Sequence, residues 1–299
     1  MTSPEVFDRR LLRARRVRAA ADAPPTFLID RAAEDLAERL APVLRRFELA
    51  VDLGTPTDAL RRRIAASGKA GTIVAADPLA GTLGTRCGLA VAADEEALPF
   101  RDASLDLVVS ALALQFVNDL PGALVQVRRA LKPDGLFLAV LAGGDTLVEL
   151  RQAFAAAEAE IEDGISPRVA PFADLRDAGA LLQRAGFALP VSDVDRLTVR
   201  YASPFALMDD LRRMGAANAL VERSRRPLRR ATLRRMAEIY GERFADADGR
   251  VRATFELVWL SGWAPHESQQ QPLAPGSAQR RLADALGTTE ISAGEKARP

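Results

Sequence analysis

The sequence predicts an α/β protein with an open, mostly parallel sheet and helices on both faces. Apolar segments that fit buried strands alternate with amphipathic segments that fit helices over roughly 100 residues, which is typical of such a sheet. The strand-like run Leu49–Leu53 ends at Gly54, and a helical pattern starts directly after it. A strand that turns through glycine into a helix is the first unit of an open α/β sheet. Ligands bind there at the carboxyl ends of the strands, against helix N-termini.

Each element of this sheet is expected from a local pattern. A helix precedes the first strand, because apolar residues recur at helical spacing after Asp30, which can cap it. The helix after Gly54 ends near Gly68, and the helix over about 120–131 ends at the turn signal Lys132–Gly135. Five short apolar or β-branched runs predict strands at Leu49–Leu53, Thr72–Ala76, Leu89–Ala93, Leu105–Ser110 and Leu136–Leu141.

The second half of the chain predicts further helices and two more strands. Pro190–Val194 fits a strand, which Leu197–Tyr201 either extends or pairs with, and Thr254–Trp263 fits a last strand, antiparallel at or near the sheet edge. Helices are expected over about 145–162, 174–185, 205–214 and 228–244.

These elements imply three parts of the chain. We expect an arginine-rich N-terminal helix or arm at 1–25 and a main domain at 26–266. Within the main domain, segments of about 145–175 and 203–245 are expected to form a helical cap. Residues 267–299 are rich in Gln, Pro, Gly and Ser and predict a flexible tail.

Composition limits the classes of partner and site. There are 41 basic and 40 acidic residues, so no overall field favours nucleic acid as a partner. No apolar run approaches the ~20 residues of a membrane span, and the N-terminus lacks the apolar core of a secretory signal. Cys87 and His266 are the only residues of their types, which excludes an internal disulfide and a histidine-rich or thiolate metal site. We expect a cytoplasmic protein of a GC-rich bacterium, with no metal ligands.

Six arginines lie between Arg9 and Arg18. Because arginine is abundant throughout this chain, a solvated helix face is the favoured interpretation of the run, and an acidic partner is the alternative. Phe7, Leu12 and Val17 give the same segment a weak apolar stripe, which predicts that the helix docks on the main domain.

Carboxylates follow two neighbouring strands of the predicted sheet. Asp77 ends the second strand, where a carboxylate can accept both hydroxyls of a ribose. Asp94 ends the third strand, where it could read the exocyclic amine of an adenine. A lone Asp after a strand is more often a cap or a turn former, but these positions recur in consecutive strand–helix units. The sequence therefore predicts a nucleoside site at this edge.

The same positions resemble a known family. Asp52–Gly54, Asp77, Asp94 and the turn Leu131–Gly135 resemble class I S-adenosylmethionine-dependent methyltransferases. More narrowly, the chain is similar to the complex I assembly factor 5 family and its bacterial relatives, with the malonyl-carrier-protein methyltransferases as the nearest other branch. The narrower likeness is carried by Phe7–Arg9, Ala93–Phe100, Asp106–Ser110, Val117–Pro121, Gly143–Leu147, Ser166–Pro167, Arg184–Phe187, Leu207–Leu211 and His266–Ser268.

The resemblance implies a fold, a cofactor and a partner. The fold would be the seven-stranded, Rossmann-like class I methyltransferase fold with helical cap insertions. The cofactor would be S-adenosylmethionine and the partner an iron–sulfur subunit of respiratory complex I, which the protein would modify or help to assemble. No residue receives a catalytic role by this likeness. The cofactor-binding residues would be Asp52, Gly54, Thr55, Asp77, Pro78, Asp94, Glu95 and Ser110.

Two departures from the family pattern bear on function. The glycine-rich turn keeps Gly54 but has Pro56 and Asp58 where the family has glycines, so it loses N–H groups that would face the cofactor's carboxylate. Gln115–Phe116 stands where relatives commonly have His-Trp. We therefore expect cofactor binding to be weak or lost. Three functions stay open: a protein-modifying enzyme, a degenerate assembly or binding factor, and a methyltransferase of small acids or carrier proteins.

Overall fold

The computed structural model describes residues 5–79, 88–270 and 282–289. Contacts divide the chain into two units, Met1–Pro265 and His266–Pro299. In the second unit the described residues include one short helix, α10 (Leu282–Leu286). The flexible tail predicted for 267–299 lies largely outside the described residues, as does Cys87.

The first unit is built on a single sheet of seven strands. The spatial order is β3-β2-β1-β4-β5-β7-β6, with β1 to β5 parallel and β7 antiparallel to both of its neighbours. The predicted fold class is confirmed, and so is an antiparallel last strand next to the edge. The strands are β1 (Phe47–Leu53), β2 (Ala70–Ala76), β3 (Leu89–Val91), β4 (Leu105–Ala111), β5 (Leu131–Ala142), β6 (Ala188–Tyr201) and β7 (Val251–Trp263).

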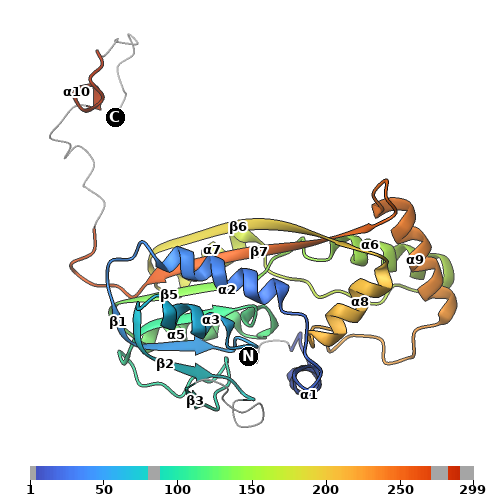
Figure 1. Cartoon of the computed structure of the whole chain (residues 1–299), viewed down its shortest axis with the longest axis horizontal. Helices are drawn as coiled ribbons and strands as arrows, with labels where there is room; N and C mark the ends of the chain where they lie inside the picture. Colours follow the sequence, from blue (N-terminus) through green and yellow to red (C-terminus); the bar gives the residue numbers. More distant parts are fainter. Residues whose placement is uncertain (1–4, 80–87, 271–281, 290–299) are drawn as a thin grey trace. The chain divides into compact units, whose positions relative to one another are not determined.

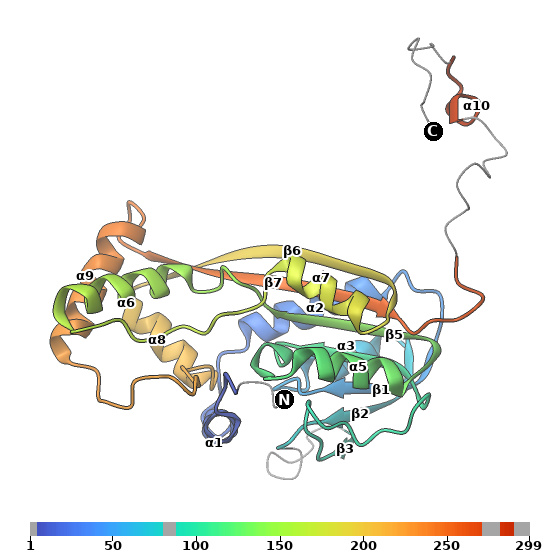
Figure 2. The same ribbon diagram turned by 180° about the vertical axis from the view of Figure 1, so that it is seen from behind.

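Helices cover both faces of the sheet (Figures 1 and 2). Helices α2 (Phe27–Leu40) and α3 (Ala59–Ala66) lie on one face, and α5 (Leu120–Ala130) and α7 (Leu175–Arg184) lie on the other. The strand β5 shows why its sequence is apolar throughout. Its odd-numbered residues, such as Phe137, enter the core under α5, and its even-numbered residues, such as Leu138, enter the core under α2.

One predicted turn is part of a strand. Lys132–Gly135 was expected to separate a helix from the next strand, but β5 already begins at Leu131 and pairs with β4 across a register shift. Asp134 takes a positive φ of 61°, and Lys132 Nζ pairs with Asp106 at 3.0 Å. Pairing with Leu105 therefore turns a local stop signal into a strand irregularity.

A third group of helices lies at the far ends of β6 and β7, which both figures show running past the rest of the sheet. It consists of α6 (Val148–Ile161), α8 (Pro204–Arg213) and α9 (Arg230–Phe244). These helices and the segment that joins α8 to α9 are called the cap below. Met236, Ile239 and Tyr240 are fully buried there. Glu149 fastens α6 to β7, because its carboxylate accepts hydrogen bonds from the N–H and the hydroxyl of Thr254 at 3.0 and 2.5 Å. No helix in the described part of the chain is long and apolar enough to cross a membrane.

Candidate nucleoside site at the carboxyl edge

Gly54 begins the loop that follows β1. Its φ is +71°, and an added Cβ would lie 2.7 Å from Glu95 Oε1 and 2.9 Å from the Ala113 Cβ. Glycine is therefore required here both by the backbone conformation and by close packing. The loop is held from below by Thr55, whose hydroxyl donates to Asp52 and accepts a hydrogen bond from the Ala111 N–H at 3.0 Å.

Asp52 and Ser110 lie beneath this loop rather than at its surface. Asp52 is 1% exposed and pairs with Arg61 at 2.6 Å; burial, opposed by Arg61 and Thr55, raises the pKa of Asp52 to about 6. Ser110 is fully buried and donates its hydroxyl to the Leu53 carbonyl at 2.7 Å. These two residues support the loop at the edge and, being buried beneath it, do not contact a ligand directly.

Asp77 ends β2 and lines a cleft at the edge. Its Oδ1 accepts a hydrogen bond from the Leu79 N–H at 2.6 Å, which closes a tight turn around Pro78. Pro78 itself lines a small hollow next to the cleft, together with Glu95. The structure thus brings Gly54, Asp77, Pro78 and Glu95 to one edge of the sheet.

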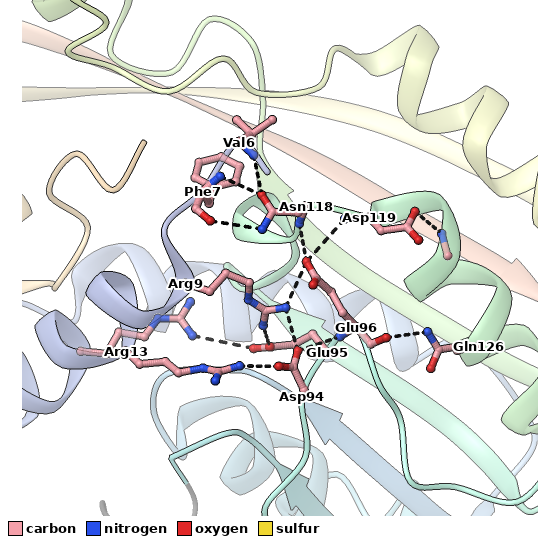
Figure 3. A network of polar contacts seen from close by, with 12 residues as sticks. Val6, Phe7, Arg9, Arg13, Asp94, Glu95, Glu96, Asn118, Asp119 and Gln126 are labelled. Carbon is pink, nitrogen blue, oxygen red and sulfur yellow. Dashed lines mark hydrogen bonds and ion pairs between the residues drawn. The ribbon is translucent and has the colours of Figure 1, made fainter. Parts of the chain in front are cut away.

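Helix α1 (Arg9–Ala20) lies against Asp94 and Glu95, and its arginines already pair with both carboxylates. Figure 3 shows Arg9 directed at this acidic run and Arg13 directed at Asp94. Arg9 pairs with Asp94 at 2.7 Å, with Glu96 at 3.1 Å and with Glu95, and Arg13 also pairs with Asp94. The edge expected to read an adenine is therefore occupied by guanidinium groups of the same chain.

The electrostatics of this cluster favour the charged forms. Burial alone would raise the pKa of Asp94, but the Glu96 N–H, Arg9 and Arg13 outweigh it and hold that pKa below its ordinary value. Burial likewise opposes the charge of Arg9, yet the carboxylates of Glu95 and Asp94 raise its pKa. Both shifts favour the ionised forms of Asp94 and Arg9 and so stabilise the ion pair between them.

The arginine run was read from sequence as a solvated helix face, and that interpretation is wrong for its inner side. The side chains of Arg9 and Arg16 are only 13% exposed, whereas Arg10 is exposed. The signal that could have found them is spacing: positions 9, 13 and 16 share one helix face, and the acidic run 94–96 supplies the opposite charge.

The chain around α1 also contacts the cap. Just before the helix, the Asp8 N–H donates to the Ala219 carbonyl at 2.8 Å, and Asp8 pairs with Arg223 at 3.1 Å. From within the helix, Arg15 donates to the Ala217 carbonyl at 2.8 Å. Helix α1 therefore connects the cap to the carboxyl edge and covers part of the site.

A cleft of about 160 Å³ remains between the sheet edge, α1, α2 and the cap. An engineered cavity of about 150 Å³ holds benzene, and pockets for drug-sized ligands measure about 300–1,000 Å³. The cleft as it stands is therefore the size of a side chain or a ligand fragment. Its chemistry is set by Arg16, Asp77, Gln115, Phe116, Phe172 and Phe255, all of which line it.

Gln115 was noted in the sequence only as a departure from relatives. It lies in the short 3-10 helix η1 (Leu114–Phe116) and donates its amide to the Leu112 carbonyl at 2.9 Å. That bond fixes the orientation of the amide, and its other atom, Oε1, is buried with no hydrogen-bond partner among the residues that the structure describes. An unpaired buried acceptor is costly, so Gln115 is a candidate acceptor for a ligand N–H.

The residues fit one half of S-adenosylmethionine better than the other. Asp77 and Asp94 are suitable acceptors for the hydroxyls and the amine of an adenosine. The loop after β1 is a poor site for the methionine half, because Pro56 has no N–H and Asp58 adds a negative charge. In the described part of the chain, no three His, Cys, Asp or Glu side chains gather in a metal-binding arrangement.

Comparison with known proteins identifies the family. Residues 51–139 match the model of a methyltransferase domain. The human mitochondrial arginine hydroxylase NDUFAF5 is 40% identical over 291 residues, which cover 93% of this chain and 83% of the human protein. The Danio rerio protein of the same name is 36% identical, with 93% and 89% covered. The chain belongs to the NDUFAF5 family. Its sheet order and methyltransferase domain make this family member a class I S-adenosylmethionine-dependent methyltransferase-like protein.

Other relatives of this NDUFAF5 family member share less of the chain. The malonyl-[acyl-carrier protein] O-methyltransferase of Laribacter hongkongensis is 41% identical over 186 residues, or 62% of this chain and 60% of that enzyme. The solved structure of Bacillus halodurans BH2331 superposes with a TM-score of 0.53 at 17% identity, covering 78% of this chain and all of that one. The latter likeness concerns the fold alone.

Proposed function

We propose that this protein is a bacterial cytoplasmic enzyme that modifies an arginine side chain of a respiratory complex I iron–sulfur subunit during assembly, with S-adenosylmethionine bound at the carboxyl edge. The observation that carries the proposal is the extent of the likeness: 40% identity to an arginine hydroxylase over 93% of the chain, when the methyltransferase domain occupies only residues 51–139. A shared cofactor would not require likeness in the cap and the N-terminal arm, whereas a shared client would.

The chemistry of the cleft supports an arginine client. A guanidinium is a planar cation that stacks on aromatic faces and donates hydrogen bonds to carboxylates and amide oxygens. With Asp77 left for the nucleoside, the cleft offers a guanidinium the Oε1 of Gln115, which has no hydrogen-bond partner among the described residues, and the rings of Phe116 and Phe172. Its volume of about 160 Å³ suits one long side chain.

The chain's own residues would bind and orient the two partners. S-adenosylmethionine supplies an activated methyl group when bound, or acts as a structural ligand if the reaction is a hydroxylation. Asp77 would hold the ribose hydroxyls and Asp94 the adenine amine. Because Arg13 and Arg9 now occupy Asp94, nucleoside binding requires side chains of α1 to shift.

The proposal is tested by deleting the gene in its bacterium and measuring both the assembly of complex I and the intact masses of its iron–sulfur subunits. Wild-type protein should restore assembly and a modified arginine, and Asp77→Asn should restore neither. Asp102→Asn is the matched control, because Asp102 is exposed and pairs only with Arg129 in the described part of the chain; it should restore both.

The other outcomes assign the function differently. Lost assembly with every subunit mass unchanged would replace the enzyme by a binding factor that holds the client. Normal complex I in the deletion strain would refute both. Lost O-methylation of malonyl-[acyl-carrier protein] in that strain would favour the carrier-protein O-methyltransferases, one of which matches 62% of the chain.

A further inference from the structure

The methionine half of the cofactor lacks an evident anchor in the loop after β1. The hydroxyl of Thr55 is used by Asp52 and the Ala111 N–H, and Pro56 has no N–H to donate. Asp58 lies at the N-terminal end of α3 and pairs with Arg62 at 3.3 Å, so a carboxylate of the chain itself already occupies this helix start. If S-adenosylmethionine binds here, as the proposed function requires, its carboxylate needs a cation from another element.

Arg16 of α1 is placed to supply that cation. It lines the cleft together with Pro56 and Asp77, and it also lines the adjoining hollow with Glu95 and Ala113. Glu95 Oε1 lies directly over Gly54, so the guanidinium of Arg16, 3.9 Å from that oxygen, lies next to the loop that has lost its glycines. The ring of Phe116 lies 5.7 Å from the guanidinium carbon and supports it from one side.

Arg16 has weaker ion-pair contacts than the neighbouring arginines Arg9 and Arg13. Arg9 contacts three carboxylates within 3.1 Å, and Arg13 contacts Asp94. In the described part of the chain, Arg16 makes no hydrogen bond, and its one ion pair is the 3.9 Å contact with Glu95. Glu95 already has a closer partner in Arg9, so Arg16 can turn to a ligand without leaving a buried carboxylate unpaired.

The groups that face Arg16 set the balance of charge around it. Glu95 and Asp77 are the facing acids, and Arg9 and Arg13 are the facing bases. Burial disfavours the charged form of Arg16 and lowers its pKa. An added carboxylate would relieve this cost, because guanidinium and carboxylate form two parallel charge-assisted hydrogen bonds.

We propose that Arg16 anchors the carboxylate of S-adenosylmethionine and so replaces the glycine-rich loop as the binding element for the methionine half. This inference rests on the proposed function only for the identity of the cofactor. It makes α1 part of the binding site, with Arg9 and Arg13 paired to the acidic run and Arg16 directed at the ligand.

Two nucleosides separate the anchor from other roles. S-adenosylhomocysteine carries the amino-acid carboxylate, and 5′-methylthioadenosine has the same adenosine and thioether without it. Calorimetry should show that Arg16→Gln lowers the affinity for S-adenosylhomocysteine by about 10- to 100-fold and leaves the affinity for 5′-methylthioadenosine unchanged. Arg16→Lys should recover part of the lost affinity, because lysine keeps the positive charge but cannot make the two parallel hydrogen bonds of a guanidinium. Arg10→Gln, on the exposed side of the same helix, should change neither affinity.

Three results would overturn the inference. If Arg16→Gln strengthens both ligands, Arg16 obstructs the site instead of serving it. If Arg16→Gln and Arg16→Lys weaken both ligands equally, the residue acts only by holding α1 in place. If the wild-type protein binds neither nucleoside, the cofactor assignment of the proposed function fails, and this inference fails with it. Thermal melting of each variant separates a loss of folding from a loss of binding.

Discussion

At the scale of single residues, the loop after β1 depends on contacts that a ligand does not see. Asp52 is a buried carboxylate between Thr55 and Arg61, and Gly54 is pressed against Glu95 and Ala113. The acidic and glycine positions of this loop are therefore required by the fold whether or not a cofactor binds. Their presence in the sequence is evidence for the fold, and their structural roles can be tested by measuring the stability of variants.

The first prediction concerns Asp52 and pH. Its folded pKa of about 6 lies above the ordinary value of 3.8, so between these pH values the folded protein keeps a proton that the unfolded chain has released. The contribution of Asp52 to stability is therefore fully present below the lower value and is lost as the pH rises towards 6, by up to about 3 kcal/mol. Urea unfolding from pH 4 to 7 should show this decline in the wild type.

Asp52→Asn should remove that part of the pH dependence, because asparagine does not titrate. The exposed Asp22→Asn should keep the wild-type decline. A variant Asp52→Asn whose unfolding free energy follows the wild-type curve in parallel would contradict the assigned pKa.

The second prediction separates two costs of replacing glycine. Gly54 and Gly68 have nearly the same φ, 71° and 68°, but an added Cβ at Gly68 would meet nothing within 4 Å. Gly68→Ala should therefore lower the free energy of unfolding only through the strain of a side chain at positive φ, by about 1–2 kcal/mol. Gly54→Ala should cost about 3 kcal/mol or more, since Glu95 and Ala113 must also move. Equal losses for the two variants in chemical denaturation would show that the contact is not restrictive.

At the scale of elements, α1 is held by two different partners. The carbonyls of Ala219 and Ala217 in the cap accept hydrogen bonds from the Asp8 N–H just before the helix and from the Arg15 side chain, and the acidic run after β3 pairs with Arg9 and Arg13. The helix has few apolar contacts, with Leu12 and Ala19 as its buried residues. Its position therefore depends on charge and hydrogen bonding more than on hydrophobic packing, which suits an element that adjusts to a ligand.

The third prediction ranks the ion pairs of α1. Arg9→Gln should destabilise the protein by about 3 kcal/mol, because Glu95, with a side chain only 3% exposed, would lose its closest cation. Arg13→Gln should cost about 0–1 kcal/mol, because the side chains of Arg13 and Asp94 are 36% and 34% exposed. Denaturant unfolding of both variants gives the comparison. A larger loss for Arg13→Gln would place the main attachment of the helix at Asp94 instead.

At the scale of the whole molecule, the sheet, the cap and α1 form one compact unit, and the chain after Pro265 belongs to a second. Besides the two cores on the faces of the sheet, a further apolar core lies where β6 and β7 extend into the cap, and it contains Met236, Ile239 and Tyr240. This core makes the cap part of the sheet's own fold. A protein client would meet a surface formed jointly by cap and sheet edge.

The fourth prediction concerns the division at Pro265. A chain that ends there should melt within about 2 °C of the full-length protein, because less than about 1 kcal/mol of stability is expected to depend on the second unit. Differential scanning calorimetry is the measurement. A fall of more than about 4 °C would mean that His266–Pro299 stabilises the first unit, contrary to the division seen in the contacts.

By itself, the sequence determined the sheet and the edge at which the candidate site lies. Strands β1, β4 and β5 are apolar on both faces, and parallel strands between two helical layers require that pattern, so local composition was sufficient. Gly54 and Asp77 follow strand ends, and the topology of an open α/β sheet brings such residues to one edge.

Only the tertiary structure decided what occupies that edge. Positions 9, 13 and 16 share one helix face, but nothing local to that helix shows that the face packs on an acidic run 86 residues away from Arg9. The same holds for Lys132–Gly135, which lie within β5 because Leu131 and Leu136 on either side of them both pair with β4. Periodicity reports which side of an element is buried, because burial acts on each residue separately. The partner of a buried charge depends on how the chain closes over long distances, and that information appears only when the elements are assembled.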